Sequence, residues 1–382
     1  MIGLNEIMGM MMDTKPDVSL GELARTRNLP AVQFGGRYRL IDFPLSNMVL
    51  SGIKHVGVVI YSKYSTLLEH LGAGMPWGLD RKTDGLKLLP TASPGLYNSE
   101  MGFDLKDLSV NADMLKKARQ QYILLSGSGL LYRFDYRRML ESHLGRGADF
   151  TVLYKQEDYE DEYLADPDRT QYLSYLSVGP DGRISSVVAR PRSGRNNLFL
   201  EAVLVSKDLL IECMNLAMAS GGSKDLMDII GDNIRSLRVF GYKFEGYVAK
   251  LNSIVNYFDC NMDLKSESVR DALFYEDGPV FTRSIDRPPT KYYATAEVKD
   301  SLVSTGCFIH GRVEGSVLSR NVYVGKDSFV KNCILLRRCR IEGNVHIENA
   351  ILDSEVVISS GITLKIDSSG GRPIVVGKES RL

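Results

Sequence analysis

The sequence lacks an excess of either charge, because its 47 lysines and arginines equal its 47 aspartates and glutamates. A net charge of zero produces no global field that favours nucleic acid or an anionic membrane surface. The sequence also lacks an apolar run near the roughly 20 residues that a membrane-spanning helix needs. Its N-terminus has no basic segment followed by an apolar stretch and a small-residue cleavage site, so we expect no signal peptide. We therefore expect neither a nucleic-acid partner nor membrane association.

Cysteine is scarce as well: five residues are scattered through 382, and none forms a C-x-x-C pair. An odd, scattered set fits a reduced cytoplasm better than a disulfide framework, so we expect a cytoplasmic protein. Apolar residues make up 44% and charged residues 25% of the chain, which is ordinary for a globular protein. The length exceeds one typical hydrophobic core and predicts two domains.

The N-terminal part alternates short apolar runs with helical stretches. Continuous apolar strands separated by helices indicate an α/β domain whose parallel or mixed sheet is covered on both faces. The expected strands are 55–61, 122–125, 149–154 and 202–205, and the expected helices are 63–71, 135–144, 208–219 and 225–236.

The C-terminal part has a different period, with apolar residues six positions apart and small or turn-forming residues between them. A repeat of six predicts a parallel β-helix, in which the inward side chains of triangular coils stack on one another. A small antiparallel sandwich is the alternative. The domain boundary is expected at Arg287-Pro288-Pro289, because adjacent prolines block both a helix and a central strand. The two apolar sets are Val317, Tyr323, Phe329, Leu335, Ile341 and Ile347, and Cys333, Cys339, Val345, Ile351 and Val357.

Several segments, taken in order, resemble bacterial glucose-1-phosphate adenylyltransferases, which transfer AMP from ATP to glucose 1-phosphate. They are FGGRYRLIDFPLSN at 34–47, YRFDY at 132–136, FEGY at 244–247, NMDL at 261–264 and PPTK at 288–291. The resemblance implies a Rossmann-like nucleotidyltransferase α/β domain with a mixed sheet at residues 1–250. It further implies a linker at 251–290, a left-handed parallel β-helix at 291–382, and a role in glycogen biosynthesis.

The chain departs from the active enzymes at the two aspartates with which the family binds Mg²⁺. The position three residues before the tyrosine of Tyr-x-x-Asp-Tyr is Gly129, and the position three residues after the tyrosine of Phe-Glu-Gly-Tyr is Lys250. An ammonium cannot ligate a metal ion and repels one at close range. Together the two changes argue against metal-assisted catalysis. We therefore expect no cofactor in this chain, and Mg²⁺ only in an active partner subunit.

The substrate contacts of the family are altered too. The phosphate-facing lysine of Ala-Lys-Pro is Leu29, the lysine of Glu-Lys-Pro is Arg190, and the Ser-Met-Gly of the glucose pocket is Phe199-Leu200-Glu201. Arg190 keeps a charge that can hold a phosphate, although arginine and lysine are not interchangeable. The methionine-rich residues 4–12 stand where we expect the Gly-rich nucleotide loop. Methionines cannot let backbone N–H groups approach a phosphate as glycines do.

In these departures the chain resembles the non-catalytic D-type subunit that pairs with an active adenylyltransferase in some Gram-positive bacteria. The resemblance implies a regulatory or structural subunit, catalytically impaired by itself, in a mixed tetramer with an active subunit. One alternative is an active or weakly active nucleotidyltransferase with a rearranged site. Another is a sugar-phosphate-binding sensor or a β-helix acyltransferase. The acyltransferase is weakened because His310 and His346 show no acid–base partner in the sequence.

Family activators are sugar phosphates or related anions held by basic residues near the domain junction. By this resemblance the candidates for an effector site are Arg27, Arg37, Arg39 and Lys291, with surface salt bridging as the alternative. Gly35-Gly36 lacks the spacing of a phosphate-binding motif and predicts a structural turn leading into a helix. The cluster of Arg337, Arg338 and Arg340 predicts a solvated face or a subunit contact.

Overall fold

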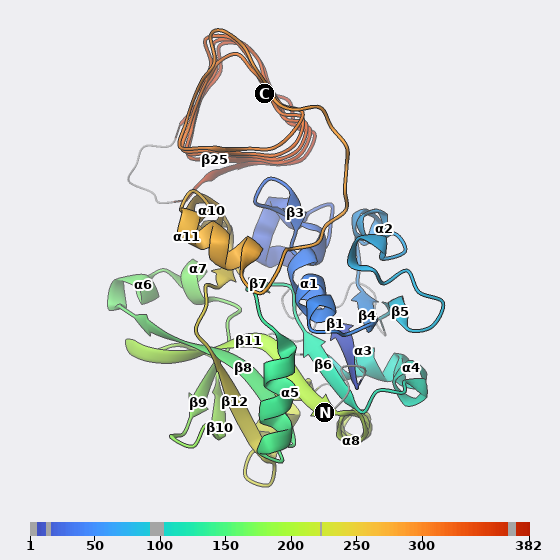
Figure 1. Ribbon diagram of the computed structural model, residues 1–382. Coiled ribbons are helices and arrows are strands. Elements are labelled where there is room, and N and C mark those ends of the chain that lie inside the picture. Colours follow the sequence, from blue (N-terminus) through green and yellow to red (C-terminus); the bar gives the residue numbers. More distant parts are fainter. Residues whose placement is uncertain (1–5, 13–16, 92–102, 222–223, 366–371) are drawn as a thin grey trace.

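The computed structural model describes residues 6–12, 17–91, 103–221, 224–365 and 372–382, which form two domains (Figure 1). An α/β domain is built from the N-terminal part of the chain. A triangular column of short strands, drawn in orange and red, stands on top of it in this view and contains the C-terminus.

In the described part of the chain, a mixed sheet of nine strands forms the centre of the α/β domain. The strands are β1 (Ile7–Met11), β4 (His55–Ile60), β5 (Gly85–Pro90), β6 (Tyr122–Ser126), β8 (Phe150–Tyr159), β9 (Tyr175–Val178), β10 (Ile184–Val188), β11 (Gly194–Ser206) and β12 (Val239–Phe244). Their main order is β10-β9-β11-β6-β1-β4-β5, and β8 pairs with β11 and β12 beside this path. β1 is parallel to β4 and β6, whereas β11 is antiparallel to β6 and β8. The mixed sheet that the sequence predicts is therefore confirmed.

Helices and buried side chains cover both faces of this sheet (Figure 1). The four expected helices are confirmed, with ends that differ by a few residues, and further short helices lie between the strands. The helices are α1 (Asp42–Leu50), α2 (Ser65–Leu71), α3 (Leu105–Val110), α4 (Ala112–Lys117), α5 (Tyr136–Gly145), α6 (Asp161–Ala165), α7 (Pro167–Thr170), α8 (Lys207–Ala219), α9 (Leu226–Asp232), α10 (Ile254–Asp263) and α11 (Glu267–Arg270).

The methionine-rich segment is the buried strand β1 and not a loop. Met8, Met10 and Met12 pack on one face of the sheet, and Ile7 and Met11 pack on the other. Our interpretation that these methionines replace the nucleotide loop is therefore wrong, because alternating side chains of a central strand must be apolar on both faces. Residues 4 and 5, and residues 13–16 that follow the strand, lie outside the described part of the chain.

The C-terminal domain is a left-handed β-helix whose three sides are three parallel sheets. One sheet contains β14 (Lys291–Tyr292), β17 (Phe308–Ile309), β20 (Tyr323–Val324), β23 (Arg340–Ile341) and β26 (Val357–Ile358). The second contains β15 (Glu297–Lys299), β18 (Arg312–Glu314), β21 (Phe329–Lys331), β24 (His346–Glu348) and β27 (Thr363–Leu364). The third contains β16 (Leu302–Val303), β19 (Val317–Leu318), β22 (Ile334–Leu335), β25 (Ala350–Leu352) and β28 (Ile374–Val376).

The central coils of the β-helix are slightly shorter than the period of six predicts. One coil runs from Val324 to its pairing partner Ile341, and the next runs from Ile341 to Ile358. Residues at the same place in neighbouring coils, such as Arg338 and Glu355, have a sequence separation of 17. Three full periods of six are one residue longer than each of these coils. The spacing between inward-facing residues is therefore five instead of six once in each coil.

This shorter spacing changes which side chains face inward. Tyr323 and Phe329, expected inside, are only half-buried, and Val324 and Val330 fill the interior instead. The later members of the same apolar set lie inside as expected, namely Leu335, Ile341 and Ile347.

The two domains share an apolar core in which residues of η1 (Asp17–Ala24) and α10 meet the third sheet of the β-helix. Residues 251–290, expected to be a linker, include α10 and α11. The Gly35-Gly36 turn also touches the β-helix, because Ser304 Oγ donates to the Gly36 carbonyl at 3.0 Å. Both glycines have positive φ, and this turn joins β2 (Gln33–Phe34) to β3 (Tyr38–Arg39) just before α1. The predicted structural turn is thus confirmed.

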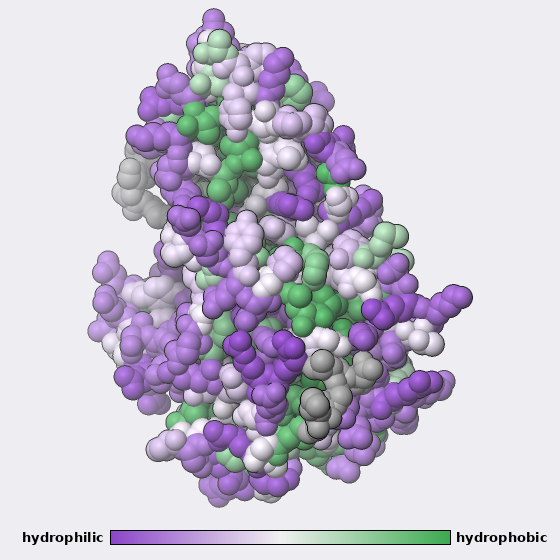
Figure 2. Space-filling model, in the orientation of Figure 1, coloured by the Kyte–Doolittle hydropathy of each residue, from purple (hydrophilic) through white to green (hydrophobic). Residues whose placement is uncertain are grey.

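The surface of the view in Figure 2 is mostly hydrophilic, with hydrophobic residues in separate patches on both domains. Across the described residues, none of the helices combines the length and the apolar character that crossing a membrane requires.

Candidate functional site

Lys250 lies on a small two-stranded sheet, and Gly129 directly precedes the other strand of that sheet. This sheet pairs β7 (Leu130–Leu131) with β13 (Ala249–Lys250), and Lys250 faces Leu130. The backbone N–H of Leu251 donates to the Gly129 carbonyl at 3.0 Å. The two positions that the resemblance identifies from separate motifs therefore belong to one place in the fold.

The Lys250 ammonium lies inside a cage of three side chains. Its Nζ is 3.0 Å from Glu157 Oε2 and 5.2 Å from the ring centres of both Tyr159 and Tyr163. The Tyr159 hydroxyl donates to the same Glu157 oxygen at 2.7 Å. Burial lowers the pKa of Lys250, but the Glu157 carboxylate outweighs it and holds that pKa above its usual value. The ammonium thus stays charged between an opposite charge and two aromatic faces.

Glu157 also faces a second lysine. Lys155 Nζ lies 3.8 Å from Glu157 Oε1. Burial, together with the nearby Lys250, lowers the pKa of Lys155 although Glu157 opposes this. Burial also raises the pKa of Glu157, but Lys250 and the Tyr159 hydroxyl lower it below its usual value. This cluster therefore contains two ammonium groups for one carboxylate.

Glu201 supplies a further carboxylate beside Gly129, whose N–H donates to Glu201 Oε2 at 3.3 Å. Glu201 is buried and has a φ of 52°, a left-handed conformation that favours glycine. The Ser-Met-Gly of the resemblance has a glycine at this position. Phe199 and Leu29 are also fully buried, in two different cores. These side chains fill space where the resemblance expects substrate contacts.

Arg190 remains exposed, unlike the other altered substrate positions. It lines a cleft of about 580 Å³, together with Gln171, Tyr172 and Pro191. Its guanidinium therefore stands in an open cleft.

A separate basic cavity of about 80 Å³ lies at the junction of the two domains. Arg37 and Arg39 reach it from the β2–β3 hairpin, and Arg320, Arg337 and Arg338 reach it from the β-helix. Arg283 and Arg287, which precede the first coil, also line it, whereas Glu69 is the one carboxylate in its described lining. Clustered guanidiniums of this kind suit an anion with several oxygens.

The arginines of the basic cavity repel one another. Burial and the Arg337 charge lower the pKa of Arg39 to about 10, and burial with the Arg37 charge lowers the pKa of Arg320. Within the described residues, Arg337 Nε is buried without a hydrogen-bond partner. Arg39 is partly held in place, since it donates to the Thr66 carbonyl at 2.8 Å. An incoming anion would relieve this repulsion.

The other two candidates for the effector site lie elsewhere. Arg27 is buried and donates to both carboxylate oxygens of Asp353. Lys291 is exposed on β14, 4.7 Å from the ring centre of Tyr293. The structure therefore brings Arg37 and Arg39 together with arginines that the sequence assigned to a solvated face or did not single out.

The histidines of the β-helix also find partners that the sequence did not show. His346 lies 2.8 Å from Glu348 Oε1 on the same strand, and His310 stacks on Tyr293 with ring centres 3.6 Å apart. His346 is half-buried on the outer face of β24.

Comparison with known proteins agrees with the two kinds of domain. A nucleotidyl transferase family model matches residues 19–164, and a GlmU-like C-terminal hexapeptide model matches residues 288–372. The chain is 30% identical to the glycogen biosynthesis protein GlgD of Bacillus subtilis (strain 168), over 98% of this chain and 96% of that protein. It is also 30% identical to the glucose-1-phosphate adenylyltransferase of Clostridium perfringens (strain 13 / Type A), over 99% and 96%.

The chain belongs to the glucose-1-phosphate adenylyltransferase family. It is 28% identical to the glucose-1-phosphate adenylyltransferase of Bacillus anthracis as well, over 90% of each chain. Within this family, the chain has the nucleotidyltransferase domain and the stacked hexapeptide coils, and it is similar to both GlgD and the named enzymes.

Proposed function

We propose that this chain is the regulatory or structural subunit of a glucose-1-phosphate adenylyltransferase that supplies ADP-glucose for glycogen biosynthesis. In this role it is catalytically impaired by itself and assembles with an active subunit, as a mixed tetramer in the cytoplasm. Mg²⁺ then belongs to the active partner. Similarity to both GlgD and active enzymes supports this proposal.

The observation that carries the proposal is the Lys250–Glu157 pair beside Gly129. Phosphoryl transfer in this family needs a divalent cation to neutralise developing charge. Here a lysine ammonium stands at one of the two metal-binding positions, and the other position has no side chain. A fixed ammonium cannot exchange ligands with a phosphate as a metal ion does.

A regulatory subunit also needs a binding site for an effector, and the basic cavity is our candidate for that site. We propose that a sugar phosphate or related anion binds between Arg37 and Arg39 of the α/β domain and Arg320 and Arg337 of the β-helix. An anion at a domain junction changes the relative stability of different domain arrangements, and such a change can alter a neighbouring active subunit.

The direct test is an assay of the purified chain with and without an active subunit from the same genome. We expect negligible ADP-glucose formation by the chain alone. We expect co-purification of the two chains and a higher maximal rate or substrate affinity in the mixture. Mg²⁺-dependent turnover by the chain alone, close to that of an ordinary family enzyme, would favour the alternative of a rearranged active site. No association at micromolar concentration, with unchanged kinetics, would favour the sensor.

A further inference from the structure

The segment formed by α6 and α7 lies over the Lys250 cage, and neither helix contains a fully buried residue. Tyr163 and Leu164 are only partly buried against the core. Hydrophobic burial therefore contributes little to holding this segment in place. A segment of this kind is expected to open more easily than the sheet beneath it, because local opening follows buried contact area.

Aromatic contacts hold the inner side of the segment. The Tyr163 ring of α6 stacks on Tyr159 of β8, with ring centres 4.9 Å apart and planes inclined by 17°. The same Tyr163 ring forms one wall of the cage around the Lys250 ammonium. The Lys250 side chain is 17% exposed, and movement of Tyr163 would open the ammonium further to solvent.

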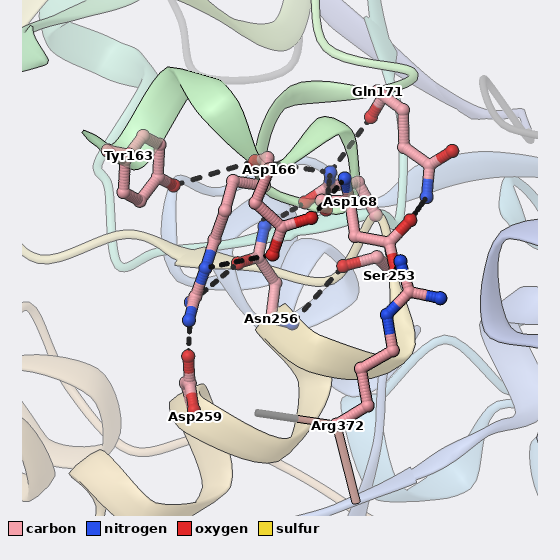
Figure 3. Close-up of polar contacts among 10 residues, drawn as sticks. Tyr163, Asp166, Asp168, Gln171, Ser253, Asn256, Asp259 and Arg372 are labelled. Carbon is pink, nitrogen blue, oxygen red and sulfur yellow. Dashed lines mark hydrogen bonds and ion pairs between the residues drawn. The ribbon is translucent and has the colours of Figure 1, made fainter. Parts of the chain in front are cut away.

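Polar contacts with α10 hold the outer side of the segment (Figure 3). The Arg169 guanidinium pairs with Asp259 and lies 3.3 Å from Asn256 Oδ1. In return, Asn256 Nδ2 donates to the Arg169 carbonyl at 2.9 Å. Asn252, which lies just before α10, donates from Nδ2 to the Gln171 carbonyl at 2.8 Å. Asn252 and Asn256 are buried, so α10 is the fixed side and the α6–α7 segment is the side that can move.

We propose that α6–α7 is a latch over the Lys250 cage, beside the open Arg190 cleft that Leu164 and Thr170 also line, and that the Arg169–Asp259 pair helps to hold the latch shut. That the segment is closed over the cage follows from the contacts alone. Only the identity of the covered place as a former metal position rests on the proposed function. With the latch shut, Tyr163 covers one side of Lys250, at the position where the resemblance expects a metal ligand. A lysine ammonium covered in this way keeps the former metal position closed to a metal ion.

The test uses Asp259→Ala in the full-length chain, with Asp263→Ala as the matched control. Both residues lie on α10, but Asp263 accepts a hydrogen bond from Tyr247 and does not contact the latch. Amide hydrogen exchange of residues 161–170 reports opening of the latch, and acetylation of Lys250, followed by mass spectrometry, reports exposure of the cage. We expect Asp259→Ala to raise both rates about tenfold, the effect of losing one charged hydrogen bond of a partly exposed pair. Asp263→Ala should change neither rate.

Arg169→Gln breaks the same pair from the latch side and replaces Asp259→Ala if that variant folds poorly. Equal exchange and equal acetylation in the Asp259 and Asp263 variants would overturn the latch. The proposed function fails separately, through turnover by the chain alone or through lack of association with an active subunit, and neither result changes the exchange measurement.

Discussion

Arg27 and Asp353 lie 326 residues apart in the chain, yet the Arg27 guanidinium donates two hydrogen bonds, of 2.9 and 3.0 Å, to the Asp353 carboxylate. Arg27 belongs to the α/β domain and Asp353 to the β-helix, and both side chains are almost completely buried. This pair therefore fixes the position of the β-helix on the α/β domain at one defined point.

Removing one partner of this pair should destabilise the protein strongly. We expect Arg27→Met to cost about 3–5 kcal/mol, because it leaves the Asp353 carboxylate buried without its counter-charge. The double variant Arg27→Met/Asp353→Leu should recover part of that loss, since no charge then remains unpaired. Urea unfolding of the two variants and the unaltered chain measures the difference. If the double variant were less stable than Arg27→Met, the unpaired Asp353 carboxylate would not be the cause of the loss.

Restoring the two aspartates should not restore the enzyme. We expect Gly129→Asp/Lys250→Asp to stay more than ~100-fold below an active family member, because catalytic groups that act as a unit are non-additive. The new carboxylate at 250 would face Glu157, and Leu29, Phe199 and Glu201 would still fill the substrate positions. ADP-glucose formation with saturating Mg²⁺ measures this. Family-like rates from the double variant would mean that the remaining altered positions do not impair catalysis.

The Lys250–Glu157 pair should stabilise the protein only within a defined pH range. The lowered pKa of Glu157 means that its contribution is present above the ordinary glutamate pKa of about 4.3 and is lost as the pH falls through the folded value. The raised pKa of Lys250 means that its contribution is present below about 10.4 and is lost as the pH rises through the folded value. The stability difference between the unaltered chain and Glu157→Gln/Lys250→Met should therefore be flat from about pH 5 to 10 and change below about pH 4. A difference that varies steadily across the neutral range would contradict this.

His143 should make the protein sensitive to mild acid. This buried histidine of α5 lies 2.9 Å from Thr151 Oγ1, and burial lowers its pKa to about 4. Between this value and the unfolded value of about 6.5, the unfolded chain binds the proton and the folded chain does not, so stability falls as the pH falls. His143→Gln should flatten the stability profile between these two values in chemical denaturation. An unchanged slope in that variant would assign the acid sensitivity to other groups.

Inorganic phosphate should stabilise the chain through the basic cavity. At ten times its dissociation constant a ligand adds about 1.4 kcal/mol, which raises the melting temperature of a chain of this size by about 2 °C. Arg39→Gln and Arg337→Gln should each reduce this rise. Arg340→Gln is the matched control, since Arg340 lies on the same β-helix but pairs with Glu342. Equal shifts in all three variants would mean that phosphate binds outside the cavity.

Much of the fold could be predicted, because apolar runs and the period of six report burial directly. The one-residue shift of this period at Tyr323 and Phe329 could not be predicted, since Val324 and Val330 beside them are also apolar. A count of apolar residues therefore does not reveal which neighbour faces inward.

The candidate site was predicted less completely. The resemblance identified Gly129 and Lys250, but Glu157 contacts Lys250 across 93 residues, and no local pattern connects them. For Arg320 and Arg337 the sequence does contain a signal that they lie close together. They occupy the same place in successive coils of the β-helix, so a count by coils would have placed them one above the other.

The constant size of the central coils also sets the unit in which this domain can change its length. Adding or removing one whole coil would change the height of the column by one layer and leave every remaining side chain on its own side of the triangle. An insertion of another size keeps the layers in place only where a corner takes it up, as between Ala350 and its pairing partner Ile374, which are further apart in the sequence than partners in the central coils. The corners follow the same repeat, since Asn321, Arg338 and Glu355 all have positive φ at equivalent places in successive coils. Relatives with taller or shorter columns should therefore differ by whole coils, with the domain junction unchanged.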